Sequence, residues 1–140
     1  MANCYSAEVV SKRTLSSLLL AVIATVSCGG GSTARPDLPN SVAPGWNLTS
    51  LNKATPPSEL PASGSPTCWK ADYSGPGSAQ IWVCGYASET SAFDAQQRIS
   101  ARARTVKFQE GKRLVIVQWK DTKKTDLEAL IRTIQKRLHA

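Results

Sequence analysis

Histidine is almost absent from this chain of 140 residues, since His139, next to the C-terminus, is the only one. Its scarcity excludes Ser-His-Asp and Cys-His nucleophile systems and His-rich zinc sites. The phosphate-binding patterns Gly-x-x-x-x-Gly-Lys and Gly-x-Gly-x-x-Gly are also missing, and the carboxylates are scattered over turns and predicted helix starts. We therefore predict no cofactor and no metal site, and we expect a protein that is not an enzyme.

Long apolar runs are missing as well. The longest, Leu15–Val26, has about a dozen residues, whereas a helix that spans a bilayer needs roughly 20. The run follows Lys12 and Arg13 and ends in small residues, which is the order typical of a secretory signal. The sequence therefore predicts a signal peptide over residues 1–27.

Thr25–Cys28 resembles a bacterial lipobox, the motif whose Cys thiol receives diacylglycerol before the signal is cut. Ser27 has the required small size, although Thr25 stands where Leu is usual. The tether-like run Gly29–Ser32 follows, and several acyl chains at about 0.8 kcal/mol per buried CH₂ would anchor the protein stably. Because Gly29 is not Asp, the usual sorting rule implies the outer membrane in a host with two membranes. The alternative is a periplasmic or secreted protein in which Cys28 is a free thiol.

Residues 28–65 are rich in Gly, Pro and Ser, and prolines interrupt any helix or central strand. This composition predicts a disordered tether. Trp46–Leu48 is the exception, because a lone Trp in a linker usually docks against a folded part. It could pack on the domain as a short edge strand.

Residues 66–140 are predicted to form one small α+β domain that starts with a β-hairpin. The aromatic and β-branched runs Thr67–Tyr73 and Ala79–Tyr86 flank a Gly-Pro-Gly turn. Folding about Pro76 places residues whose numbers sum to 152 opposite each other, so Cys68 faces Cys84. In an exported chain this pair predicts a structural disulfide. A redox-active pair is the weaker reading, because the Cys-x-x-Cys spacing is absent.

The rest of the domain alternates helices and strands. We expect a helix over residues 91–103 with Phe93, Gln96 and Ile99 on its apolar stripe, and strands over 105–109 and 113–119. A capping box at Thr125 would start a second helix, whose apolar face is Leu127, Leu130, Ile131, Ile134 and Leu138. The order ββαββα predicts a four-stranded, mainly antiparallel sheet with both helices on one face.

The formal net charge is +7, and basic residues gather in the last third of the chain. We single out a candidate face for anionic polymers or lipid headgroups, formed by Arg102, Arg104, Lys123 and Lys124. A solvated surface of mixed charge is the plainer reading. Nucleic acid is not expected as a partner outside the cytoplasm.

From Cys28 onward the chain resembles a class of small, uncharacterised bacterial lipoproteins, in which a tether leads to one short α+β domain. The resemblance rests on Thr25–Cys28, on Gly29–Ser32 and on the strand, helix and hairpin order of residues 79–120. It implies an envelope location, attachment to the membrane through lipid on Cys28, and no known activity. The first hypothesis is a domain that binds another envelope protein or an anionic polymer. The alternatives are a soluble periplasmic or secreted binder of anionic ligands, and a small hydrolase that uses two carboxylates in one pocket.

Overall fold

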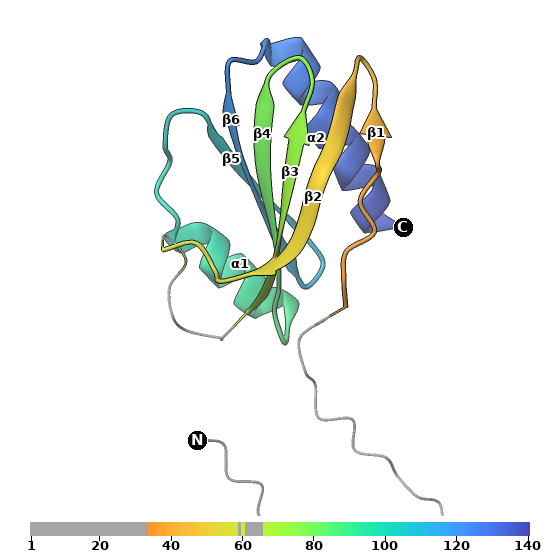
Figure 1. Cartoon of the computed structure of the whole chain (residues 1–140). Helices are drawn as coiled ribbons and strands as arrows, with labels where there is room; N and C mark the ends of the chain where they lie inside the picture. Colours follow the sequence, from red (N-terminus) through yellow and green to blue (C-terminus); the bar gives the residue numbers. More distant parts are fainter. Residues whose placement is uncertain (1–33, 59, 61–65) are drawn as a thin grey trace, which may run out of the picture.

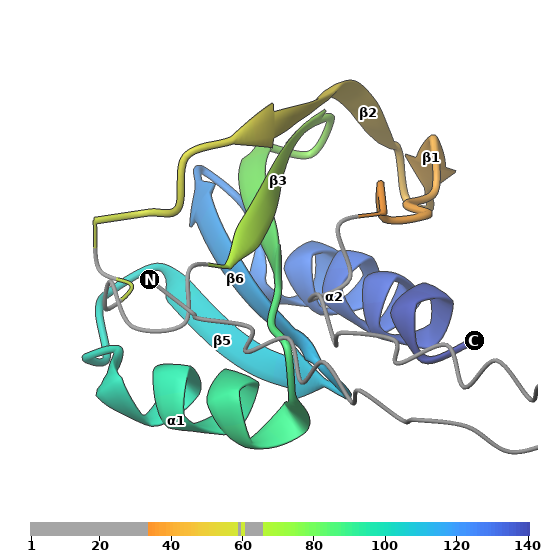
Figure 2. The ribbon, with the colours of Figure 1, turned by 90° about the horizontal axis from the view of Figure 1, so that it is seen from below.

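The computed structural model describes residues 34–58, 60 and 66–140; the predicted signal peptide and Cys28 lie outside this part. Six strands form one antiparallel sheet in the order β1-β2-β3-β4-β6-β5, and two helices pack on it (Figure 1). The elements are β1 Ser41–Val42, β2 Trp46–Ala54, β3 Thr67–Ser74, β4 Ser78–Gly85, α1 Glu89–Arg98, β5 Thr105–Glu110, β6 Arg113–Lys120 and α2 Lys124–His139. The sheet curls around α2, as a half-barrel does (Figure 2).

The prediction of a four-stranded sheet is wrong, because part of the predicted tether belongs to the sheet. Strand β2 lies between β1 and β3, and its Trp46 is fully buried. The indole Nε1 of Trp46 donates to the carbonyl oxygen of Asp126, 3.0 Å away. The nearby prolines lie outside β2, and a β-bulge at Thr49 shifts its pairing with β3. The bulge breaks the strict alternation by which a strand is recognised in sequence.

The hairpin of β3 and β4 has the predicted register. Cys68 pairs with Cys84, Trp69 with Val83 and Ala71 with Ile81. Its turn is packed between two others: a Cβ on Gly75 would lie 2.2 Å from the Gly45 carbonyl oxygen, and one on Gly77 would lie 2.6 Å from that of Asp121. Glycine is therefore needed at both positions. Three connections meet at this end of the sheet: the β1–β2 turn, the β3–β4 turn and the β6–α2 loop.

The two helices cover opposite faces of the sheet, so the prediction that they share one face is wrong (Figure 2). Strand β6 explains this arrangement, because its side chains alternate between the two cores. Val115 and Val117 pack with α2, whereas Leu114 and Ile116 pack with α1. Because this strand carries apolar side chains on both faces, a helix must pack against each face of the sheet.

Helix α1 begins earlier and ends earlier than predicted. Ser88 is its N-cap, and its Oγ accepts a hydrogen bond from the Ser91 amide, 3.1 Å away. The buried face is Ala92 and Ala95, while Phe93 of the predicted stripe is 51% exposed. Ile99, which follows the helix, is buried as predicted. Helix α2 has the predicted buried residues Leu127, Leu130, Ile134 and Leu138, but its N-cap is Lys123 and no capping box forms at Thr125.

Candidate functional site

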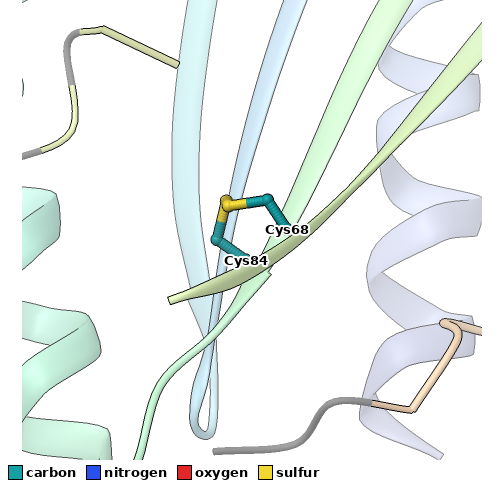
Figure 3. The surroundings of a disulfide bond; sticks show 2 residues. All are labelled: Cys68 and Cys84. Atoms are coloured by element: carbon teal, nitrogen blue, oxygen red, sulfur yellow. A yellow bond between two sulfur atoms is a disulfide. The ribbon is translucent and has the colours of Figure 1, made fainter. Parts of the chain in front are cut away.

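The two cysteines of the hairpin form a buried disulfide, as predicted. The sulfurs are 2.01 Å apart and the Cα atoms 4.0 Å apart, across neighbouring strands (Figure 3). Both side chains lie in the core under α1, together with Tyr86 and Leu114. A disulfide enclosed in this way is inaccessible to redox partners, so it stabilises the fold and does not form a reactive site.

The four predicted basic residues come from two segments that the sheet brings to one end. Arg102 and Arg104 precede β5, whereas Lys123 and Lys124 follow β6. The carbonyl oxygen of Arg104 accepts a hydrogen bond from the Trp119 amide, 3.2 Å away, which joins the two segments. We call Arg102, Arg104, Lys120, Lys123 and Lys124, all of them exposed, the basic end.

Acidic groups at the basic end neutralise it only in part. Lys124 Nζ lies 3.8 Å from Glu128 Oε1, one turn further along α2. Asp121 lies in the β6–α2 loop, and Asp126 lies in the first turn of α2. The first turn of α2 adds the partial positive charge of a helix N-terminus. The potential of this end is therefore positive, which suits an anionic partner.

A second surface lies on the face of the sheet that carries α1, beyond the part that the helix covers. Antiparallel pairing aligns a cross-strand row of polar side chains: Ser50, Asp72, Gln80, Gln118 and Thr105. A shallow depression of about 500 Å³ lies along this row. We call it the trough, and its lining includes Thr49, Asp72, Ser78, Gln80, Gln118 and Trp119.

Asp72 is fixed in the trough by its neighbours. Ser50 Oγ donates to Asp72 Oδ2 at 2.6 Å, and Lys70 Nζ lies 3.5 Å from Oδ1. The same ammonium lies 5.3 Å from the ring centroid of Trp82, the residue opposite it on β4. Lys70 therefore balances the charge of the Asp72 carboxylate.

A third surface is an open cavity of about 500 Å³ at the β5–β6 turn. Glu89 and Glu110 both line it, which is the feature expected of a carboxylate hydrolase. However, Glu110 Oε2 lies 3.3 Å from His139 Nδ1, and Glu89 is in the first turn of α1, where it complements the helix dipole. The cavity is also lined by the cations Lys112 and Arg113. A carboxylic acid that acts as a general acid is kept protonated by apolar surroundings, which this cavity lacks. The cavity therefore supports a hydrolase less well than the other two surfaces support binding.

Apart from the buried Tyr73 and Tyr86, ionisable side chains are on the outside: in residues 34–58, 60 and 66–140, no Asp, Glu, Lys, Arg or His is buried. No group of His, Cys, Asp and Glu in that part of the chain could hold a metal ion. None of the helices described is long and apolar enough to cross a membrane.

The basic residues are evident in the sequence, but the trough is not. The signal was available in part, because Lys70 and Gln80 alternate with the apolar residues of β3 and β4. It could not be used without knowing that β2 belongs to the sheet and that α1 covers only part of this face.

No protein-family model, no curated protein and no solved structure matches this chain.

Proposed function

We propose that this chain is an exported envelope protein, anchored through lipid on Cys28, whose domain binds another envelope component without catalysis. The buried Cys68–Cys84 disulfide is the observation that carries the proposal, because such bonds persist in oxidising compartments. The open, shallow form of the polar surfaces supports binding of an extended partner more than turnover of a small substrate.

The way the chain enters the domain supports a partner that lies away from the membrane. Asp37 Oδ2 lies 3.4 Å from Arg137 Nη1, so the described chain begins near the C-terminal end of α2 (Figure 1). Only residues 29–33 separate Cys28 from Ala34, and a chain of this length reaches about 20 Å at most. The basic end lies at the other end of α2, about 20 Å from Arg137 at 1.5 Å per residue. It would therefore face envelope polymers and not the headgroups of the anchoring bilayer.

Intact mass and membrane fractionation of the wild type and of Cys28→Ala test the anchor. We expect the wild type in the membrane fraction with a mass increase for diacylglycerol and the acyl chain, and Cys28→Ala in the soluble fraction without it. In a host with two membranes the lipidated form should be in the outer one. If both forms are soluble and carry no lipid, the anchor is refuted, and a periplasmic or secreted binder replaces it.

A second candidate function is the binding of an anionic ligand at the basic end. The convergence of Arg104 and Lys123 at one end of the sheet favours it. Sodium polyphosphate is a suitable probe. Changing Arg102, Arg104, Lys123 and Lys124 to Gln should weaken its binding at least tenfold at low salt, and the wild-type affinity should fall as salt is added.

A matched variant controls for total charge. Lys53, Lys112, Arg132 and Lys136 are also exposed, and changing them to Gln removes the same four charges elsewhere. Equal losses in the two variants would show that polyphosphate responds to net charge alone, and the basic end would then not be a site.

A further inference from the structure

The trough and the basic end form one continuous surface, since Lys120 belongs to both. It lines the trough at the end of β6 and is three residues from Lys123. A ligand that lies along the polar row therefore reaches the cationic residues without leaving the protein surface. This continuity restricts the chemistry of the ligand more than either surface does alone.

The trough offers hydrogen bonds that the protein itself does not use. The side-chain amides of Gln80 and Gln118 face each other across β4 and β6, and neither has a hydrogen-bond partner within the described part of the chain. An amide both donates and accepts, which suits hydroxyl groups that also do both. Asp72, held by Ser50 and Lys70, adds a fixed acceptor.

An irregularity of β2 shapes the rim of the trough. The bulge at Thr49 interrupts the regular pairing of β2 with β3 at the rim of the trough. The Thr49 hydroxyl donates to the Asp72 carbonyl oxygen, 2.9 Å away. Bulges often occur where a side chain is redirected toward a site. Trp119 also borders the trough, but its ring packs with the core around α2 on the opposite face of the sheet, so the surface beside the two amides is polar.

We propose that this combined surface binds an acidic polysaccharide: a chain whose hydroxyl groups bond to the amides of the trough and whose anionic groups lie at the basic end. Neutral glycans lack the groups that the basic end attracts, and polyanions without sugar hydroxyls leave the amides unused. The inference rests on the proposed function, because an exported domain is the one that meets such polymers.

Three probes of similar length separate these contributions: an oligogalacturonate, a neutral malto-oligosaccharide and sodium polyphosphate. They are titrated into the Cys28→Ala chain, which has the whole sequence except the anchoring thiol. We expect the oligogalacturonate to bind at least tenfold more tightly than either of the others. We also expect it to shift the side-chain amide resonances of Gln80 and Gln118.

The variant Gln80→Ala with Gln118→Ala should weaken oligogalacturonate binding about tenfold, since each neutral hydrogen bond contributes a factor of roughly 2 to 10. It should leave polyphosphate binding unchanged. The control is Gln97→Ala with Gln135→Ala, which removes one exposed and one half-buried amide from the helices and should change neither.

The outcomes separate the two proposals. If polyphosphate binds as tightly as the oligogalacturonate and the Gln80 and Gln118 amides do not respond, the polysaccharide inference is overturned while anion binding stands. If only the neutral glycan binds, the basic end is not part of the site, and the inference fails. Binding of none of the probes refutes the inference and leaves the lipid anchor to its own fractionation test.

Discussion

Gly77 is the residue at which three segments come closest together. A Cβ there would lie 2.0 Å from Thr122 Oγ1, and also 2.6 and 2.8 Å from the carbonyl oxygens of Asp121 and Lys120. A hydroxyl can rotate away, but the two backbone oxygens cannot move without displacing the β6–α2 loop. The contact therefore determines how the β3–β4 turn fits against the start of α2.

Gly77→Ala should lower the free energy of unfolding by about 2 kcal/mol, the usual cost of overpacking a close contact. Urea denaturation measures it. Adding Thr122→Ala should not restore stability, because the backbone oxygens remain. Gly111→Asn is the control, since Asn tolerates the φ of 56° there and a Cβ would lie no closer than 3.8 Å to its nearest neighbour, Glu89 Oε1. A Gly77→Ala protein as stable as wild type would contradict the close approach.

Tyr73 links the segment before β1 to the sheet, and its ionisation should govern alkaline stability. Its buried hydroxyl donates to the Pro39 carbonyl oxygen at 2.7 Å, and burial raises its pKa from 10.0 to about 12. Between pH 10 and 12 the unfolded state loses this proton and the folded state keeps it, so stability falls as pH rises. Burial also raises the pKa of Tyr86, which adds to the slope.

Tyr73→Phe should lower the free energy of unfolding by about 1 kcal/mol at pH 7, because the hydrogen bond to Pro39 is lost. That cost should shrink as pH rises from 10 to 12, since the variant has no proton to lose at this position. Urea midpoints at pH 8, 10 and 11.5 measure the trend. An equal cost at all three values would contradict the role of Tyr73 ionisation.

At the scale of elements, the disulfide holds β3 to β4 in the middle of the sheet. Its two cysteines are 16 residues apart, and closing a loop of this size stabilises by about 3 kcal/mol in the chain-entropy model. Dithiothreitol should lower the urea midpoint of the wild type accordingly. Cys68→Ala with Cys84→Ala should be less stable than the oxidised wild type and insensitive to dithiothreitol. A wild type whose midpoint does not respond to reduction would refute the stabilising role.

Strands β1 and β2 complete the core around α2, so the domain should not fold without them. Val42 and Trp46 pack in the same core as Leu130 and Ile134. A chain that begins at Pro66 should lose cooperative unfolding, whereas one that begins at Ala34 should keep wild-type stability. The milder substitution Trp46→Phe should lower the free energy of unfolding by about 2 kcal/mol, because it leaves a small cavity and an unpaired carbonyl oxygen at Asp126. Cooperative unfolding of the shorter chain would contradict this assignment.

Particular elements explain how far the sequence could predict the fold. The β3–β4 register was predictable because the cysteines and the apolar alternation select the same pairing. Of strand β2, only Trp46–Leu48 was expected as a strand, and at the edge of the sheet; the rest was missed, since the bulge breaks the alternation and the prolines around it suggest a tether. The placement of the helices also failed, although the run from Leu114 to Val117, apolar on both faces, already indicated that each face needs cover.

For the whole molecule, the candidate sites depend on pairings that sequence alone does not reveal. The basic residues could be listed from the sequence, but the antiparallel pairing of β5 with β6 is what brings Arg104 beside Trp119. The polar row requires the pairing of five strands, from β2 across β3, β4 and β6 to β5. Local patterns therefore located the charges, and long-range pairing determined which of them act together.

The position of chain entry gives the last prediction. If Cys28 is lipidated, the short segment over 29–33 holds the C-terminal end of α2 near the bilayer and the basic end away from it. Thiol dyes on Lys136→Cys and on Lys123→Cys should then transfer energy to a headgroup acceptor with clearly different efficiencies in vesicles, Lys136→Cys being the closer. The difference arises because the two positions lie about 20 Å apart along α2. Inserting twenty Gly and Ser residues before Ala34 should remove it, since a long flexible linker no longer restricts orientation. Equal efficiencies without the insertion would show that the domain has no preferred orientation relative to the bilayer. The basic end would then be as accessible to the bilayer as to envelope polymers.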